Sequence, residues 1–378
     1  MLNIVVDQNI AFASTAFNQF GKVTLIPGRK ITNSILKNVD VLIVRSITSV
    51  DGNLLKNTKV KFVGTATIGT DHIDFEYLKV NNIYFADAKG CNAYSVAEYI
   101  VAALLNLAVK FDFKFQSKSI GIVGVGNVGS KVAVFAKALG MNVLLNDPPL
   151  KRIGDKRDFV DLDEILKCDI VTIHTPLNLT GIDRTHHLFD KYNLSKLKDG
   201  TIFINTSRGA VVNNLDLITA IDKSNLKVIL DVWENEPNFN EDLLRKTLIA
   251  TPHIAGYSYE GKVNGTKMVY ESLCKYLEAD YTFDFKLDKP QNSNLDSEYE
   301  DRIEITLNKI ISAIYSINRD DDKMKKSYVM NFQERLEYFD LQRKNYPTRR
   351  EFNNYTVNSK FMNEEVKNLL KKLRFNLS

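Results

Sequence analysis

The chain has few cysteines, and their placement excludes two kinds of site. Only three of the 378 residues are cysteine: Cys91, Cys168 and Cys274. They lie far apart, and no CxxC or Cys/His spacing surrounds them, so neither a disulfide framework nor a zinc site is expected. Unpaired thiols suit a reducing compartment. We therefore expect a cytoplasmic protein that holds no metal.

The chain also lacks a large charge excess and a long apolar run. Its 50 Lys and Arg outnumber 46 Asp and Glu by only four, and the basic residues form no single tract. Such a balance does not predict nucleic-acid binding. No uninterrupted apolar run is long enough for a membrane span, and Met1–Asp7 is more typical of a first strand than of a signal peptide. A soluble chain of this length is expected to form two or three domains.

Short apolar runs alternate with helical stretches through the first 286 residues, which predicts parallel sheets with crossover helices. A long, largely buried helix, Ser95–Lys110, separates two series of such runs. We expect α/β architecture with two doubly wound, Rossmann-like sheets. The predicted strands are Leu2–Val6, Val23–Ile26, Val41–Val44, Phe62–Val63 and Ile83–Phe85, then Ile120–Val123, Val143–Leu145, Ile170–His174, Ile202–Asn205, Val228–Leu230 and Leu248–Ala250.

The composition changes after about residue 286. Lys289–Glu300 is polar and without periodicity, which is typical of a linker. The remaining tail contains apolar residues at helical spacing, which predicts amphipathic helices. We expect residues 287–378 to form a small α+β domain whose apolar faces bind a second copy of the chain. The two periodic sets are Leu307, Ile310, Ile311, Ile314 and Ile317, and Val366, Leu369, Leu370 and Leu373.

A glycine-rich turn opens the second series. The run Gly124-Val-Gly126-Asn-Val-Gly129 follows the strand Ile120–Val123 and precedes a predicted helix, Ser130–Leu139. The first glycine permits a tight turn, the second lets a pyrophosphate approach the backbone, and the third lets helix and strand pack closely. The free N–H groups of the helix N-terminus then face the phosphates. This context predicts a dinucleotide site.

An acidic residue stands where the adenosine ribose would lie. Asp147 follows Gly129 by eighteen residues and comes just after the strand Val143–Leu145. A carboxylate there accepts hydrogen bonds from ribose hydroxyls and repels the extra phosphate of NADP, so we expect NAD. A purely structural glycine turn, with a surface Asp at a strand end, is the alternative.

Three polar residues follow later strands in an order that suits the oxidation of a 2-hydroxy acid. Arg208 can clamp the substrate carboxylate, because guanidinium pairs with carboxylate in a planar fork. His253 can remove the hydroxyl proton, and Glu236 can orient the imidazole and stabilise its protonated form. Each residue alone has an ordinary structural explanation, such as an ion pair or a turn. The ordered set, downstream of a dinucleotide turn, predicts hydride transfer.

The sequence resembles the D-isomer-specific 2-hydroxyacid dehydrogenases in Val63–Asp71, Gly124–Gly129, Asn205–Gly209, Asp231–Pro237 and Thr251–Gly256. The resemblance implies two α/β domains and the same catalytic roles for Arg208, Glu236 and His253. It also implies that Ser46, Thr67 and Tyr257 contact substrate. The residues implied to contact NAD are Gly124, Gly126, Asn127, Val128, Gly129, Asp147, Thr175, Asp231 and Gly256.

Within that family, the resemblance is strongest to a member that oxidises a phosphorylated 2-hydroxy acid and dimerises through its C-terminal domain. It implies a substrate-binding, flavodoxin-like domain at residues 1–94 and 257–286, an NAD-binding domain at 95–256 and a dimerisation domain at 287–378, hence a homodimer. One departure is the pair Thr206-Ser207, where that member is expected to have Ala-Cys; both residues here are small.

A phosphorylated substrate needs a second cation. Arg45, beside Ser46, is the first candidate, and Arg349 or Arg350 from a partner's tail is the second. A structural ion pair is the alternative role for Arg45. Two other functions also remain open: a different enzyme of the family, such as a D-3-phosphoglycerate dehydrogenase, and a non-catalytic scaffold that senses NAD.

Overall fold

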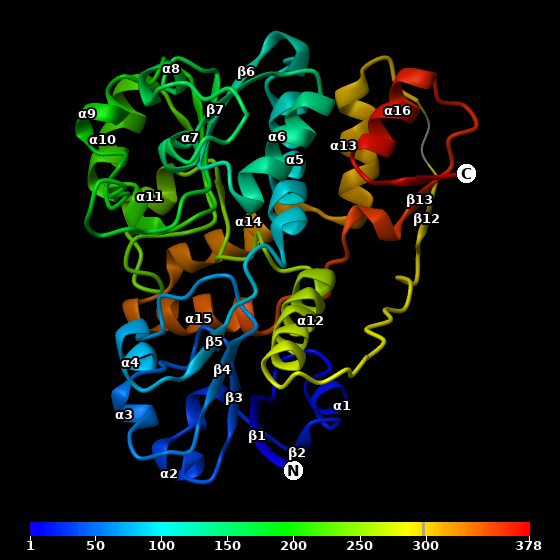
Figure 1. The fold of residues 1–378 in the computed structure, drawn as a ribbon. Helices are drawn as coiled ribbons and strands as arrows, with labels where there is room; N and C mark the ends of the chain where they lie inside the picture. The colour runs from blue at the N-terminus through cyan, green and yellow to red at the C-terminus, as the bar shows by residue number, and fades with distance from the viewer. Residues whose placement is uncertain (297–298) are drawn as a thin grey trace. The chain divides into compact units, whose positions relative to one another are not determined.

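The structure is a computed structural model that describes residues 1–296 and 299–378 (Figure 1). The chain forms two compact units. The first unit contains Met1–Asn92 and Ser258–Lys289, and the second contains Ala93–Tyr257 and Pro290–Ser378. Each unit has its own parallel sheet covered by helices on both faces. The predicted α/β class with two doubly wound sheets is therefore confirmed.

The first unit is built on a five-stranded parallel sheet with the order β2-β1-β3-β4-β5. Successive side chains of each strand point to opposite faces of the sheet, so Ile4 packs against one layer of helices and Val5 against the other. Helices α1 (Ala13–Phe17) and α12 (Tyr259–Tyr276) cover one face, and α2 (Asn33–Leu36), α3 (Gly52–Leu55) and α4 (Phe75–Val80) cover the other. The strands are β1 (Leu2–Asp7), β2 (Gly21–Ile26), β3 (Val41–Val44), β4 (Phe62–Thr65) and β5 (Tyr84–Ala86).

The second unit is built on a six-stranded parallel sheet with the order β11-β10-β9-β8-β6-β7. Helices α5 (Ala93–Lys110) and α6 (Asn127–Ala138) cover one face. Helices α8 (Leu162–Ile165), α9 (Lys191–Leu194), α10 (Asn214–Ser224) and α11 (Glu241–Lys246) cover the other. The strands are β6 (Ser119–Val123), β7 (Asn142–Asn146), β8 (Ile170–Ile173), β9 (Ile202–Asn205), β10 (Lys227–Leu230) and β11 (Ile249–Ala250).

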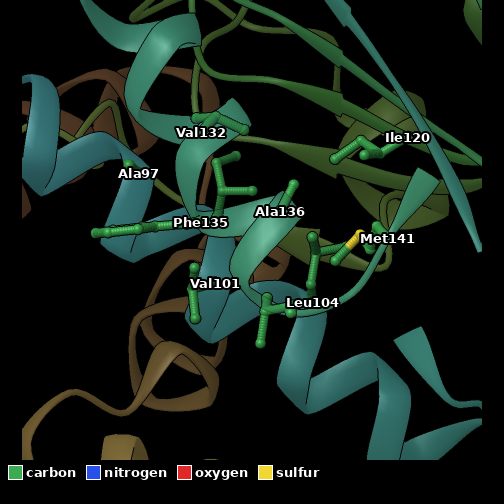
Figure 2. A pocket seen from close by; sticks show the side chains of 10 residues that line it. Ala97, Val101, Leu104, Ile120, Val132, Phe135, Ala136 and Met141 are labelled. Carbon is green, nitrogen blue, oxygen red and sulfur yellow. The ribbon is translucent and has the colours of Figure 1, made fainter. Parts of the chain in front are cut away.

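Helix α5 is the central packing element of the second unit. By length and mean hydropathy it is apolar enough to cross a membrane, but 78% of it is buried inside the protein, as in the core helix of a soluble fold. Its polar residues Ser95 and Glu98 interrupt the apolar run, which is why the sequence pattern does not suggest a span. The packing between α5 and α6 leaves a cavity of about 10 Å³ that is lined only by apolar side chains (Figure 2). So small a space is at the limit for one water molecule and is no ligand site.

The tail of the second unit, residues 290–378, packs on α5. It contains α13 (Ile303–Ile314), α14 (Ile317–Lys325), α15 (Phe332–Lys344), α16 (Glu364–Lys372) and a three-stranded parallel sheet formed by β12 (Asn294–Leu295), β13 (Thr356–Val357) and β14 (Asn376–Leu377). The apolar faces of α13 and α16 lie in the same core cluster as α5. These faces are covered by their own chain, so they give no reason to expect a second copy.

A buried polar network reinforces this attachment. The Glu98 carboxylate on α5 accepts a hydrogen bond from the Phe352 backbone N–H at 3.0 Å. It also pairs with Arg374 at 3.3 Å, and Arg374 pairs in turn with Glu351 at 3.0 Å. Burial and the neighbouring Glu351 raise the pKa of Glu98, although Arg374 acts in the opposite direction. The tail is therefore joined to α5 through charged as well as apolar contacts.

Candidate active site

The predicted cofactor and catalytic residues of the second unit follow six strands that all run in the same direction. Their side chains therefore lie along one edge of the sheet, where ligands bind in open α/β folds. In spatial order, the positions after the strands are His253 after β11, Glu236 after β10, Arg208 after β9, Thr175 after β8, the glycine turn after β6 and Asp147 after β7.

The glycine turn has the backbone geometry that a dinucleotide requires. Gly124 has φ of +83°, a conformation that disfavours any other residue. A Cβ atom at Gly129 would lie 2.0 Å from the Gly124 carbonyl oxygen, so helix α6 can approach the turn only with glycine there. At Gly126, by contrast, a Cβ would meet nothing within 4 Å. This open space at the N-terminus of α6 is where a pyrophosphate can approach the backbone.

Two further side chains fit the cofactor. One Asp147 oxygen accepts a hydrogen bond from the Val125 backbone N–H at 2.8 Å, and the other caps α7 (Pro148–Arg152) through the Leu150 N–H at 3.0 Å. The turn therefore fixes the orientation of this carboxylate. The Thr175 hydroxyl is buried and has no hydrogen-bond partner among residues 1–296 and 299–378. An unpaired buried hydroxyl at a strand end is suited to a ligand atom, so the residues fit NAD.

His174 links the ends of β8 and β9 at this edge of the sheet. Its ring nitrogens contact the hydroxyls of Thr172 at 3.0 Å and Thr206 at 3.3 Å. Burial lowers the pKa of His174 to about 3, so the ring is neutral at physiological pH. Thr206, the first of the two residues that depart from the expected motif, thus hydrogen bonds with a neutral imidazole.

Glu236 and His253 form a hydrogen-bonded pair. The His253 Nδ1 contacts a Glu236 carboxylate oxygen, and the other carboxylate oxygen accepts from the Trp233 N–H at 3.1 Å. Burial alone would raise the pKa of Glu236, but His253, the Trp233 N–H and Arg343 outweigh it and hold that pKa below its usual value. The His253 and Glu236 side chains are 30% and 24% exposed, so the pair is open to a ligand. The ring is therefore held through Nδ1, which leaves Nε2 available to a ligand.

Arg208 lies in a turn, Asn205–Gly209, that is held by hydrogen bonds within the turn. The Asn205 amide donates to the Arg208 carbonyl oxygen at 3.0 Å, and the Arg208 guanidinium donates to the Ser207 carbonyl oxygen at 2.8 Å. The next residue, Gly209, packs so closely on Trp233 that a Cβ would lie 2.0 Å from the Trp233 carbonyl carbon. This packing fixes the path of the backbone that carries Arg208.

The Asp231 carboxylate holds the loop that carries His253. Asp231 is 1% exposed, and its oxygens accept hydrogen bonds from the Thr251 hydroxyl at 2.6 Å, the Ile254 N–H at 2.7 Å and the Ala255 N–H at 2.9 Å. The Tyr99 hydroxyl of α5 lies 2.8 Å from the same Thr251 hydroxyl. These contacts occupy the carboxylate. They favour a positioning role for a residue that the family resemblance assigned to NAD.

The tail adds residues that sequence reasoning did not place at this site. Tyr257, which follows Gly256 at the end of the His253 loop, packs edge-to-face on Tyr346 with ring centroids 5.8 Å apart. The Arg343 guanidinium lies 6.0 Å from the centroid of the Tyr257 ring. No local pattern around Arg343 or Tyr346 indicates this, because both are more than eighty residues away in sequence.

Arg349 also contacts this loop, through the carbonyl oxygen of Ala255. It is 6% exposed, and its guanidinium donates to the Ser95 carbonyl oxygen at 3.0 Å, to the Ser95 hydroxyl at 2.8 Å and to the Ala255 carbonyl oxygen. Arg350 donates to the Asn354 side chain at 3.0 Å. Arg349 is therefore buried in its own chain, which disfavours the hypothesis that a partner's Arg349 binds substrate.

The predicted substrate residues of the first unit lie at the ends of two neighbouring strands. Arg45 and Ser46 come directly after β3. Thr67 comes two residues after Thr65, the last residue of β4. The Thr67 hydroxyl contacts the Thr65 hydroxyl at 2.8 Å. Arg45 pairs with the fully buried Asp7 at 3.2 Å while its own side chain is 31% exposed. Arg45 thus makes the structural ion pair that was the alternative role, yet part of its side chain remains accessible.

One group among the described residues has the composition of a metal site. His186, His187 and Glu234 place potential ligand atoms within 4.8 Å of one another. The imidazoles are stacked with centroids 4.0 Å apart and an interplanar angle of 26°, so their in-plane lone pairs do not converge well on one point. Arg184 also contacts the His186 Nδ1 at 3.2 Å, which opposes a second cation. The arrangement favours hydrogen bonding, here between His187 and Glu234 at 2.6 Å, over metal binding.

Comparisons with known proteins agree with this geometry. Residues 107–255 match the family described as D-isomer specific 2-hydroxyacid dehydrogenase, NAD binding domain, and residues 287–373 match a domain of unknown function, DUF3410. The erythronate-4-phosphate dehydrogenase of Tolumonas auensis is 42% identical over 387 aligned residues, which cover 100% of both chains. The enzyme of the same name from Proteus mirabilis is 43% identical over 360 residues, which cover 94% of both chains.

A solved structure extends the comparison to the fold. The NAD-dependent formate dehydrogenase from Staphylococcus aureus, in complex with NAD, has a TM-score of 0.60 and 23% identity, and the match covers 75% of this chain and 98% of that one. Because the similarity to the curated relatives spans the whole length, the family predicted from sequence is confirmed. The chain belongs to the D-isomer-specific 2-hydroxyacid dehydrogenases, in the group that contains the erythronate-4-phosphate dehydrogenases, and residues 107–255 form its NAD-binding domain.

Proposed function

We propose that this protein oxidises 4-phospho-D-erythronate to 2-oxo-3-hydroxy-4-phosphobutanoate with NAD, as a step of pyridoxal 5′-phosphate biosynthesis. The reaction class rests on one observation above all: the hydrogen bond between His253 and Glu236, on the sheet edge that also carries Arg208. The substrate follows from relatives that are named erythronate-4-phosphate dehydrogenase and match at 42–43% identity over 94–100% of the chain.

The catalytic roles follow from the chemistry of the three side chains. Arg208 binds the substrate carboxylate and thereby orients C2. His253 removes the C2 hydroxyl proton at its Nε2, and Glu236 holds the ring through Nδ1 and stabilises the imidazolium that forms. When bound, NAD accepts the hydride from C2. The glycine turn, Asn127, Val128, Asp147, Thr175 and Gly256 are proposed to hold the cofactor.

The remaining assignments concern the substrate, the domains and the assembly. We propose that residues 1–94 and 257–286 bind substrate through Ser46, Thr67 and Tyr257, with Arg45 near the phosphate. The partial exposure of the Arg45 side chain supports this role. A cytoplasmic location is supported by three cysteines that are all free thiols.

We also propose a homodimer formed through residues 287–378. Its support is the exposed apolar side chains of the tail: Val329 is 92% exposed, Phe332 53% and Leu341 49%. A V329D/F332D variant is expected to halve the mass measured by light scattering, because two charges would have to be buried in the interface. F361D is the matched control, since Phe361 is 80% exposed elsewhere in the tail. A V329D/F332D dimer of unchanged mass would place the interface elsewhere.

The function is tested with a substrate panel. The purified protein is assayed by NADH fluorescence with 4-phospho-D-erythronate, D-erythronate and D-3-phosphoglycerate, with NAD or NADP, and with or without an added 2-oxo acid that can reoxidise bound NADH. We expect kcat/KM with NAD to be at least about tenfold higher for 4-phospho-D-erythronate than for the other acids. Preference for D-3-phosphoglycerate would indicate another enzyme of the family. Cofactor binding without turnover of any acid would indicate a scaffold.

Substitution of Arg45 tests the phosphate site separately. Arg45→Ala should raise KM for 4-phospho-D-erythronate far more than for D-erythronate, because only the first carries the phosphate. Equal effects on both acids would limit Arg45 to its ion pair with Asp7.

A further inference from the structure

The tail helix α15 brings a cation to Tyr257, a few residues after His253 in the chain. Arg343 lies in the last turn of α15 and belongs to the same compact unit as Glu236 and Tyr257. Its guanidinium packs 6.0 Å from the ring centroid of Tyr257 and 5.9 Å from that of Phe339. Its Nε is buried and has no hydrogen-bond partner in the part of the chain that the structure describes. A cation held this way, between aromatic rings and largely away from water, acts strongly on nearby charges.

The charged and titratable groups around Arg343 explain its placement. Burial alone would lower the pKa of Arg343, but Tyr257 and Glu236, together with Asp340 on its own helix, raise it. The guanidinium also makes a polar contact with the Tyr257 side chain. On the other side, His253 lowers the pKa of Glu236 most, and the Trp233 N–H and Arg343 lower it further. Arg343 therefore contacts Tyr257, a proposed substrate residue, and its charge acts on Glu236, a proposed catalytic residue.

His253 and Arg343 differ in one respect that matters for the reaction. His253 must be neutral to accept the substrate proton, and in that state it no longer stabilises a neighbouring carboxylate by charge. Arg343 is charged throughout. We propose that Arg343 is a positioning residue that keeps Glu236 ionised while His253 is neutral and holds Tyr257 in place, so that the tail completes the active centre of its own chain. This inference rests on the proposed function of Glu236 and His253.

Three substitutions test the proposal through the pH profile of kcat/KM for substrate oxidation. R343M and R343Q remove the charge, and a nearby cation disfavours proton uptake by the His253–Glu236 pair. Both variants should therefore move the acid limb of the profile upward by about 0.5 to 1 pH unit. R343K keeps a charge but not the planar group, so it should leave the acid limb in place and raise KM for the substrate by about three- to tenfold. If R343M does not fold, R343Q must give the shift.

The matched control lies on the same helix. Arg335, eight residues earlier in α15, pairs with Glu241 of α11, and within the described part of the chain it contacts neither Glu236 nor Tyr257. R335M removes an equivalent link between the tail and the rest of the unit. It should leave both the acid limb and the substrate KM unchanged. A shift of the limb in R335M as large as in R343M would mean that loosening of the tail is the cause.

A second measurement separates this inference from the proposed function. The chain has only five histidines, so ¹³C-labelled histidine gives few resonances, and H253Q identifies the His253 signal. Without any substrate, the titration midpoint of that signal should move upward by about 0.5 to 1 pH unit in R343M and should not move in R335M. A midpoint that is equal in the wild type and R343M overturns the proposal. A shifted midpoint in a protein that oxidises none of the acids would uphold Arg343 and refute the function.

Discussion

The role of Asp231 offers the sharpest test of how the loop that carries His253 is held. Asp231→Asn keeps the size and shape of the side chain but replaces one carboxylate oxygen with an NH₂ group. The native oxygens accept hydrogen bonds from the Thr251 hydroxyl, the Ile254 N–H and the Ala255 N–H, at 2.6, 2.7 and 2.9 Å. The best orientation of the new amide keeps its oxygen toward Thr251 and Ile254, which share one native oxygen. The NH₂ group then faces the Ala255 N–H, and that bond is lost.

The size of the effect follows from burial. Asp231 is 1% exposed, and Ala255 is also 1% exposed, so water cannot replace the lost bond. A hydrogen bond to a charged group contributes about 1.5 to 3 kcal/mol, and a buried donor left unsatisfied costs about 1 to 3 kcal/mol. These terms overlap, and we expect the free energy of unfolding of the second unit to fall by about 3 kcal/mol. With a typical urea m-value of about 3 kcal/mol/M for a domain of this size, the midpoint falls by about 1 M.

The assay uses the single tryptophan. Trp233 is buried in the second unit, so its fluorescence reports the unfolding of that unit during a urea titration. In D231N we expect a lower urea midpoint and a lower kcat, because His253 is less well positioned, with an NAD Kd within about threefold of the wild type. T251V removes the Thr251 bond to Asp231 and also takes away the Thr251 partner of the buried Tyr99 hydroxyl, so it should lower the urea midpoint as well. An unchanged urea midpoint with an NAD Kd raised tenfold would refute the positioning role and restore the cofactor contact implied by the family resemblance.

Three further outcomes are expected. His174 has a pKa of about 3 in the folded protein, below the ordinary value of about 6.5, so between these values the unfolded chain binds more protons. The neutral, buried His174 therefore adds stability that is complete above pH 6.5 and is lost as the pH is lowered. At pH 5 the free energy of unfolding should be about 1 kcal/mol lower than at pH 7, after allowance for partial exposure. H174N should flatten that slope in calorimetry between pH 5 and 7, and an equally steep slope would contradict the assignment. Glu236→Gln should lower kcat about a hundredfold with little change in NAD Kd measured by titration calorimetry, because the acceptor that stabilises the imidazolium loses its charge; retained kcat would exclude Glu236 from the mechanism. Arg349→Met should cost about 3 kcal/mol in urea unfolding, because the carbonyl oxygens of Ser95 and Ala255 lose a buried charged donor, whereas R350M should cost less than about 1 kcal/mol.

Most of the sheet framework could be predicted from sequence for a simple physical reason. Strands buried on both faces are short apolar runs, and those at Val41–Val44 and Ile202–Asn205 have the predicted limits. Two kinds of difference occur. The predictions for β8 and β11 include one residue too many, His174 and Leu248, whereas β4 extends through Gly64 and Thr65 and β2 begins at Gly21, where polar residues or glycine continue the strand. In these places backbone pairing continues although the apolar pattern has stopped, so side-chain composition marks the strand end too early.

The proposed catalytic positions were accessible to sequence reasoning because they follow strands directly. A parallel sheet places all such positions on one edge, so the sequence alone groups Arg208, Glu236 and His253. The supporting contacts are not accessible in this way. The side chain of Asp231 folds back onto the next strand's loop, and nothing in its local sequence distinguishes that contact from a bond to a cofactor.

The tail shows a second limit. Its amphipathic periodicity correctly predicts helices with apolar faces, but periodicity does not say what covers a face. Here the faces of α13 and α16 pack into the core around α5, and Glu98 receives buried polar partners from the same tail. A partner subunit and the chain's own core impose the same pattern on a helix. Only the contacts across more than 190 residues of sequence distinguish the two.

This packing decides how the tail can be studied. A protein truncated near Asp288 would expose the apolar surface of α5 and would leave the buried Glu98 without Arg374 and the Phe352 N–H. It would also remove two contacts of the segment that carries His253, those of Arg349 with Ala255 and of Arg343 with Tyr257. Loss of activity in such a protein could not be assigned to a lost dimer, because the active centre and the core would fail together. Dimer formation and catalysis must therefore be separated by substitutions at exposed positions such as Val329, where neither the core nor the loop is disturbed.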